Sequence, residues 1–193
     1  MITSASEMGE RGEADSRLEL AGLIARARAR AAAALGPLPE RLIVVAVDRQ
    51  RLYLVEHGRV VADYRVSTAA AGVGGAEGSL RTPTGVHRLE RRIGGGEPPG
   101  MIFVDREPTG ARWNGEPVDQ DLILTRILTL DGQEEGTNRG AGCDSLSRFI
   151  YIHGTNHEQA LGTPASHGCI RLANRDVIDL YDQVAAGDPV VIV

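Results

Sequence analysis

The sequence predicts a mainly β domain with one helix before it and one helix near its end. Three observations support this fold class: short apolar segments follow one another from residue 41 onward, tight-turn sequences separate them, and helical periodicity lies near the two ends of the chain. A chain of 193 residues is long enough to enclose one sizeable core. We therefore expect a single domain over residues 41–193 preceded by an N-terminal appendage.

The N-terminal appendage divides into two parts. Residues 1–15 are small, polar and acidic and lack apolar periodicity, which predicts a disordered N-terminus. Ser16 and Glu19 have the spacing of a capping box, and apolar residues then recur every three or four positions up to a Gly-Pro pair. This pattern predicts a helix over residues 16–36.

The main domain begins with a predicted meander of three strands joined by tight turns. His57 lies in the second turn and His87 lies on a later strand, and we expect both side chains to face solvent. Asn174 is a good N-cap for the second helix, which a Gly-x-Pro sequence ends. The predicted strands span residues 42–47, 52–55, 60–67, 86–89, 121–130, 149–152 and 190–193.

Two glycine-rich regions interrupt the strand pattern. Residues 69–78 resemble a phosphate-binding loop in composition, but Glu77 stands where a dinucleotide fingerprint has its third glycine, and no Lys-Ser/Thr pair follows. Residues 93–145 contain a long excursion rich in glycine and proline. Excursions of this length are usually functional or mobile, so we expect a lid or one wall of a substrate groove.

Composition excludes several classes of protein. A net charge of -5 and an isoelectric point near 5.6 argue against binding to nucleic acid or to an anionic membrane. The longest apolar run, residues 42–47, is far shorter than the roughly 20 residues of a membrane-spanning helix. The sequence shows no export signal, which predicts a cytoplasmic protein, or a periplasmic one if an upstream signal is missing. Cys143 and Cys169 are then expected as free thiols.

The sequence Ser-His-Gly-Cys-Ile-Arg at residues 166–171 contains the candidate nucleophile. Cys169 follows a flexible glycine and lies two positions after a histidine, a setting that suits an activated thiolate. His153 ends a strand and precedes Gly154, so we expect it to be the base, with His167 in a secondary role. The backbone amides of Gly168 and Cys169 are candidates for an oxyanion hole.

A metal site is the alternative interpretation of the same residues. His153, His157, His167 and Cys169 could together ligate zinc, although the His-x-x-x-His spacing aligns two imidazoles only on a helix. The region between a strand end and a glycine is not predicted to be helical. We therefore expect no metal and no cofactor, and keep a zinc-stabilised binding module as the alternative.

These motifs carry a resemblance to a known family. Ile-His-Gly at residues 152–154, the run at residues 166–176 and Thr-Pro-Thr-Gly at residues 82–85 resemble the signature of the L,D-transpeptidase catalytic-domain family of bacterial cell-wall enzymes. The resemblance covers residues 41–193 and implies a β sandwich. It also implies that the partners are peptidoglycan stem peptides or muropeptides, and it makes no prediction about oligomeric state.

The resemblance implies roles for individual residues. Cys169 would attack the carbonyl of the third stem residue and form a thioester, with His153 as base oriented by the carbonyl of Gly154. Backbone amides of His167, Gly168 and Cys169 would surround the oxyanion. Ser166 and Arg171 would contact substrate, the latter through carboxylates.

The acyl acceptor is left open by the sequence. Transfer of the thioester to an amine would give L,D-transpeptidation, and transfer to water would give L,D-carboxypeptidation. A cytoplasmic location would favour the second reaction, in the recycling of muropeptides. Under the zinc alternative, the chain would instead be a cell-wall peptide-binding module.

Overall fold

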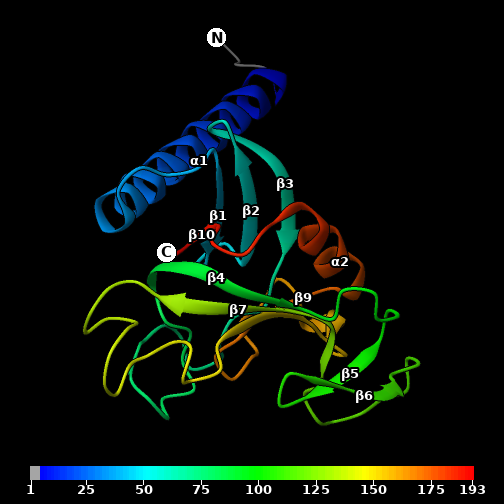
Figure 1. The fold of residues 1–193 in the computed structure, drawn as a ribbon. Coiled ribbons are helices and arrows are strands. Elements are labelled where there is room, and N and C mark those ends of the chain that lie inside the picture. Colours follow the sequence, from blue (N-terminus) through cyan, green and yellow to red (C-terminus); the bar gives the residue numbers. More distant parts are fainter. Residues whose placement is uncertain (1–4) are drawn as a thin grey trace.

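The computed structural model describes the backbone of residues 5–193 and the side chains from residue 15 onward. It is mainly β with one long helix at the N-terminal end and one shorter helix near the C-terminus, which confirms the predicted fold class (Figure 1). The helices are α1 (Ala5–Leu35) and α2 (Asn174–Gln183), and a short 3-10 helix η1 (Glu158–Ala160) precedes α2 in the sequence.

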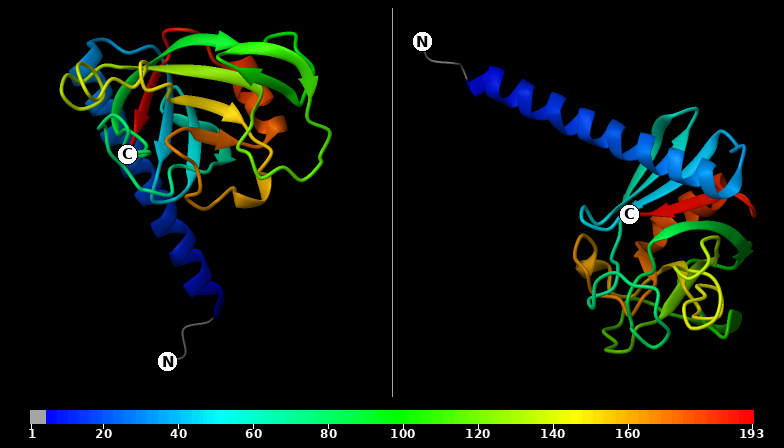
Figure 2. Two further views of the ribbon diagram at one scale, coloured as in Figure 1. Left: turned by 90° about the horizontal axis from the view of Figure 1, so that it is seen from below. Right: turned by 90° about the vertical axis from the view of Figure 1, so that its left-hand side faces the viewer.

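Helix α1 begins earlier than predicted. It is helical from Ala5, so the expected disorder is wrong for residues 5–15, and residues 1–4 lie outside the described residues. Alanine, glutamate, methionine and arginine dominate this stretch and favour helix even without an apolar stripe. Ser16 therefore lies inside the helix instead of capping it. The N-terminal part of α1 projects well beyond the β domain (Figure 2).

Ten strands form one strongly bent sheet. Its order is β3-β2-β1-β10-β4-β7-β5-β6, with β8 paired to β7 and β9 paired to β8. Strands β1 and β10 run parallel, as do β8 and β9. The strands are β1 (Arg41–Ala46), β2 (Arg51–Glu56), β3 (Arg59–Arg65), β4 (Gly85–Ile93), β5 (Met101–Val104), β6 (Glu107–Arg112), β7 (Ile123–Gly132), β8 (Tyr151–Gly154), β9 (Ile170–Leu172) and β10 (Pro189–Ile192).

The two halves of the sheet face each other across the main core. This core joins side chains of β1, β2 and β10 with side chains of β7, β8, β9 and α2, including Ile43, Leu128, Ile152 and Leu180. Just after β3, Ser67 pairs with Arg171 of β9 through backbone hydrogen bonds of 3.0 and 2.9 Å. This bridge joins the first part of the sheet to β9, so β9 is held along both of its edges.

A second core lies on the outer side of the sheet, under α1. Ile24, Ala27 and Ala31 of the helix pack against the faces of β1, β2, β4 and β10. Because the residues of β1 alternate between this core and the main core, both faces of the strand are buried, and its sequence is an unbroken apolar run. The helix is therefore part of the folded unit that carries the sheet.

The excursion between β4 and β7 is more regular than predicted. Strands β5 and β6 form a hairpin within it, and β5 also pairs with β7. Met101 and Phe103 pack with Ile127 and Tyr151 in a third apolar cluster. Apolar alternation over residues 101–104 was short, and β6 is exposed along its whole length, so its sequence lacks the pattern of a half-buried strand.

Two polar side chains differ from the sequence predictions. His87 does not face solvent: it is fully buried, and its Nε2 lies 2.9 Å from Ser145 Oγ. Asn174 is not the cap of α2, because Ala173 occupies that position. Asn174 instead binds the carbonyl of Thr155 and the carboxylate of Glu158.

Neither helix is long and apolar enough to cross a bilayer within the described part of the chain.

Candidate active site

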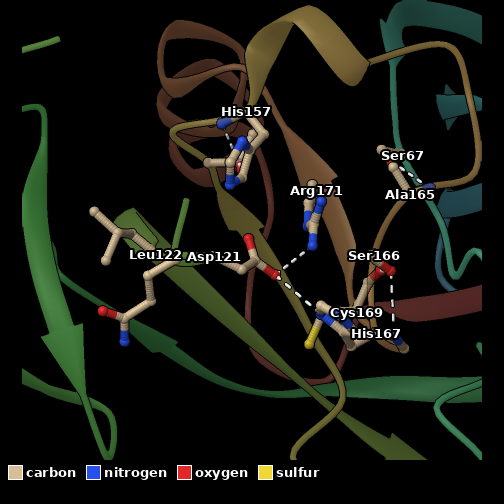
Figure 3. A network of polar contacts seen from close by, with 12 residues as sticks. Ser67, Asp121, Leu122, His157, Ala165, Ser166, His167, Cys169 and Arg171 are labelled. Carbon is tan, nitrogen blue, oxygen red and sulfur yellow. Dashed lines mark hydrogen bonds and ion pairs between the residues drawn. The ribbon is translucent and has the colours of Figure 1, made fainter. Parts of the chain in front are cut away.

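The parallel pair β8–β9 places the predicted site residues on one face. His153 lies opposite Arg171 in the register, and Cys169 precedes β9 by one residue. Side chains alternate along a strand, so Cys169 and Arg171 share a face with His153 while Ile152, Ile170 and Leu172 point into the main core. Figure 3 shows the side chain of Asp121 directed toward Arg171 and His167, with Cys169 close by.

His153 is held in one orientation by its own backbone neighbour. Its Nδ1 lies 2.8 Å from the carbonyl oxygen of Gly154, which can only accept a hydrogen bond. Nδ1 therefore carries the proton, and Nε2 is left as a free base. The side chain is 1% exposed, and this burial lowers the pKa of His153 below its ordinary value, so the imidazole is neutral at neutral pH.

Gly154 is required by close packing as well as by the position of its carbonyl. A Cβ at this residue would lie 2.7 Å from the carbonyl oxygen of Leu124 and 2.6 Å from Asn174 Oδ1. The backbone of β8 thus approaches β7 and the start of α2 more closely than any side chain would permit. This packing fixes the strand end from which His153 projects.

The thiol of Cys169 is half-buried beside the third apolar cluster. Its Sγ lies 3.4 Å from the carbonyl oxygen of Phe149. Burial raises the pKa of Cys169 to about 11, although a backbone hydrogen bond from Tyr151 acts in the opposite direction. The thiol is therefore protonated at neutral pH, because the apolar surroundings disfavour the charge. A base must remove the proton during reaction.

Both cysteines are free. Cys143 has its own partner, with Sγ 3.1 Å from the carbonyl oxygen of Arg139.

Hydrogen bonds within residues 166–169 fix the shape of the nucleophile loop. The buried hydroxyl of Ser166 donates to the carbonyl of Cys169 at 2.6 Å and accepts from the amide of Gly168 at 3.2 Å. Thr82 donates from Oγ1 to the carbonyl of Gly168 at 2.9 Å. Gly168 has φ +135°, a conformation that L side chains rarely adopt. Ser166 is thus used within the loop, where we had expected a contact with substrate.

The predicted oxyanion donors differ in availability. The amide of Gly168 already has a partner in Ser166, so it can serve an oxyanion only by giving up that bond. The amide of Cys169 precedes β9 and lies outside its ladder with β8. His167 is exposed and contributes its backbone next to the thiol. Amides of residues 167 and 169 are therefore the better candidates.

Arg171 is the most buried charged group of the site, and no sequence motif indicates its partner. Its side chain is 3% exposed, and Nη2 contacts Oδ2 of Asp121. The same carboxylate oxygen lies 3.8 Å from His167 Nδ1 (Figure 3). We had interpreted Asp121 only as the first residue of a strand. A single carboxylate just before an apolar strand carries no motif, so no sequence signal would have identified it.

A groove opens beside these residues. One pocket of about 250 Å³ is lined by Asp121, His167 and Arg171 together with Asp119 and His157. A second pocket of about 390 Å³ shares Asp119 and His157 and extends between residues 113–119 and residues 156–159. Part of the predicted excursion therefore forms one side of this groove.

The predicted zinc ligands do not form a metal site. Among the residues that the structure describes, no three His, Cys, Asp or Glu side chains are grouped closely enough to hold a metal ion. His153 Nδ1 is directed at a backbone carbonyl, and His157 Nε2 lies 3.3 Å from the side-chain amide nitrogen of Asn156. His153 and His157 belong to a strand and to the turn after it, where His-x-x-x-His spacing does not bring two imidazoles together.

Comparison with known proteins agrees with this geometry. The sequence profile of the YkuD family, the L,D-transpeptidase catalytic domain, matches residues 40–192. A putative L,D-transpeptidase of Bacillus subtilis strain 168, YkuD, is 48% identical over 83 residues, or 39% of this chain and 51% of the relative. Another from the same organism, YqjB, is 27% identical over 160 residues, or 81% of this chain and 73% of the relative.

Solved structures show the same fold. An Enterococcus faecium L,D-transpeptidase superimposes with a TM-score of 0.50 at 16% identity, over 81% of this chain and 50% of that chain. The avibactam carbamoyl enzyme of Ldtfm gives a TM-score of 0.51 at 17% identity, over 81% of this chain and 49% of that chain. The match to YkuD spans about half the length of that relative. Since the family profile matches most of the sequence, the chain belongs to the YkuD family of L,D-transpeptidase catalytic domains.

Proposed function

We propose that this chain is a cysteine-dependent enzyme that cleaves the L–D peptide bond after the third residue of peptidoglycan stem peptides. Cys169 is the nucleophile, and the product of the first step is a thioester with release of the terminal D-amino acid. The arrangement of His153 supports this proposal most directly: the 2.8 Å contact of Nδ1 with the Gly154 carbonyl leaves Nε2 as a base on the face that carries Cys169.

In the proposed acylation, the proton of the Cys169 thiol ends on the leaving amine. His153 Nε2 takes the proton from Cys169 Sγ as sulfur bonds to the substrate carbonyl carbon, and then gives this proton to the nitrogen of the leaving amine as the C–N bond breaks. The amides of residues 167 and 169 stabilise the oxyanion. Ser166 and Thr82 hold the loop in the required shape through their hydrogen bonds.

The second step transfers the acyl group to an amine or to water. The groove beside Arg171 offers space for a peptide strand of the acceptor, which would favour L,D-transpeptidation. The cellular compartment bears on the same choice, since a cytoplasmic protein would meet recovered muropeptides and a periplasmic one would meet the wall. Fractionation of cells that express the full gene would decide which substrate pool is available.

Mass spectrometry of the protein and its products tests the proposal. Incubation with a disaccharide tetrapeptide should give an acyl adduct on Cys169 and free D-alanine. A tripeptide product then indicates water as acceptor, and a joined dimer indicates an amine. Cys169→Ala should lose the adduct and all turnover, whereas Cys143→Ser, which removes the other free thiol, should retain both.

Full turnover by Cys169→Ala would refute the nucleophile assignment. Folded wild-type protein that forms no adduct with any stem peptide would refute the substrate assignment. Stoichiometric zinc whose removal unfolds the protein would instead support the zinc-stabilised peptide-binding module, which the positions of the four predicted ligands do not favour.

A further inference from the structure

We propose that Asp121 is a positioning residue for the reaction at Cys169: by pairing with the buried guanidinium of Arg171, it allows the neighbouring imidazole of His153 to carry the transferred proton. This inference rests on the proposed function, because it assigns a task within the same acylation step. Asp121 belongs to none of the motifs that identified the site.

The geometry places Asp121 against Arg171 and His167, which are neighbours of the reacting pair His153 and Cys169. Arg171 lies opposite His153 in the β8–β9 register, and its side chain is almost fully buried. Asp121 approaches from the segment before β7, with a side chain that is 26% exposed at the groove. Its Oδ2 contacts Arg171 and also faces His167 Nδ1 at 3.8 Å. One carboxylate thus joins the β7 side of the site to β9 and to the nucleophile loop (Figure 3).

Arg171 would oppose the reaction if it had no partner. A guanidinium keeps its charge at any working pH, and a second positive charge close by disfavours protonation of an imidazole. His153 is buried, so water screens this repulsion poorly. Pairing with Asp121 replaces a bare cation beside His153 by a nearly neutral ion pair. The imidazolium that forms during proton transfer is then tolerated.

Charges around the site act on both reacting groups with definite signs. On His153, burial lowers the pKa, Asp121 raises it and Arg171 lowers it. On Cys169, burial raises the pKa, Asp121 raises it further, and Arg171 and Arg148 lower it. Removing the carboxylate should therefore lower both pKa values. The free thiol would ionise more easily, while the imidazole would accept the proton less readily.

Loss of the carboxylate should thus make the thiol of Cys169 easier to ionise and the imidazole of His153 harder to protonate. A merely structural role of Asp121 would not produce both effects, so they can be tested. In a Cys143→Ser background, where one thiol remains, we would measure kcat/KM against pH with a stem tetrapeptide and the alkylation rate of Cys169 against pH. Asp121→Asn should lower kcat/KM at least about tenfold and shift the alkylation midpoint to lower pH. Asp121→Glu should restore much of the activity.

A second substitution separates charge from shape. Asp121→Asn with Arg171→Gln removes both charges, so it should return the alkylation midpoint of Asp121→Asn toward the wild-type value. Asp63→Asn is the matched control, because Asp63 pairs with Arg51 at 2.6 Å on β2 and β3 and touches none of the site residues. It should leave both profiles unchanged. Thermal melts would establish that each variant is folded.

Two results would overturn the inference. One is a folded Asp121→Asn protein whose alkylation midpoint is unchanged. The other is a double variant whose alkylation midpoint stays at the Asp121→Asn value, because the charge balance at Cys169 would then not depend on the ion pair. If the wild-type protein turns over no stem peptide, the proposed function fails, yet the alkylation midpoints still decide whether Asp121 controls the charge balance at Cys169.

Discussion

The hydroxyl of Thr82 donates a 2.9 Å hydrogen bond to the carbonyl oxygen of Gly168, the residue immediately before Cys169. Thr82 is fully buried, and its Oγ1 also accepts the amide of Ala69 at 3.0 Å. One side chain of the Thr-Pro-Thr-Gly sequence thus connects the turn before β4 to the nucleophile loop. The motif contributes to the site through this contact.

Thr82→Val should keep the shape of the side chain but lose both hydrogen bonds. Two buried groups, the Gly168 carbonyl and the Ala69 amide, would then lack their partner, at a cost of roughly 1–3 kcal/mol each. We expect a lower melting temperature and a fall in kcat/KM of at least about tenfold, since the loop loses its fixed position. Thr82→Ser retains the hydroxyl and should stay close to wild type. Equal loss in both variants would contradict the role of the hydroxyl.

Reactivity of Cys169 toward an alkylating reagent should be low at neutral pH. With a thiol pKa of about 11, the thiolate fraction grows about tenfold for each pH unit up to that value. We expect the alkylation rate of the Cys143→Ser protein to rise steadily from pH 7 to beyond pH 9. A plateau reached below pH 8 would show instead that the thiol is already ionised in the resting protein.

Turnover should persist at mildly acidic pH. Burial lowers the pKa of His153, so the base stays neutral below the pH at which an ordinary imidazole, with a pKa near 6.5, becomes protonated. In a profile of kcat/KM against pH, we expect the midpoint of the acidic decline to lie below pH 6.5. A limb centred above pH 7 would mean that His153 is charged in the free enzyme and cannot act as the resting base.

Stability should decrease in acid because of His87. Burial lowers the pKa of His87 from 6.5 to about 4, so the unfolded chain binds a proton in this range that the folded chain does not. Stability from this group is therefore complete above pH 6.5 and is lost as the pH falls toward 4, by at most about 3 kcal/mol. Urea unfolding at pH 7 and pH 4.5 should show this loss.

Replacement of His87 tests the assignment. His87→Gln should reduce the difference between the two pH values, although the protein is less stable at both. His57→Asn alters an exposed imidazole in the β2–β3 turn and should retain the wild-type difference. An unchanged difference in His87→Gln would assign the acid sensitivity to other groups.

Gly154→Ala should disrupt the site through packing. The new methyl group would lie 2.7 Å from the Leu124 carbonyl oxygen, so β8 must move away from β7 and carry His153 with it. We expect a loss of roughly 1–3 kcal/mol in stability and a larger relative loss in kcat/KM. Gly22→Ala in α1 meets only the flexible end of Arg26 and should be neutral or stabilising. Wild-type activity in Gly154→Ala would contradict this account.

The positions of most strands along the chain could be predicted from the sequence, since apolar alternation and turn residues mark them, but their order in the sheet was not predicted. Strands β5, β6 and β9 were not predicted: every residue of β6 is exposed, and β5 and β9 have only four and three residues. The start of α1 was misplaced because helix-forming residues without an apolar face leave no periodic signal.

The candidate site was predictable where its residues are close together in sequence. Cys169, His153 and Gly154 lie in short motifs, and the register of β8 and β9 brings the side chains of Cys169 and His153 to one face. Asp121 could not be found in this way, because it meets Arg171 only through the long-range fold of the sheet. The size of the rise in the pKa of Cys169 could not be predicted either, since desolvation depends on the packing of side chains around the thiol.

Helix α1 ends before the region that the family profile matches, yet it covers the outer faces of β1, β2, β4 and β10. A protein shortened to residues 40–193 would retain every proposed reacting group but would present Leu42, Val44 and Val191 to water. Such a fragment would tend to self-associate through this apolar surface. Aggregation of the shortened protein would then lower the activity that an assay of this fragment measures.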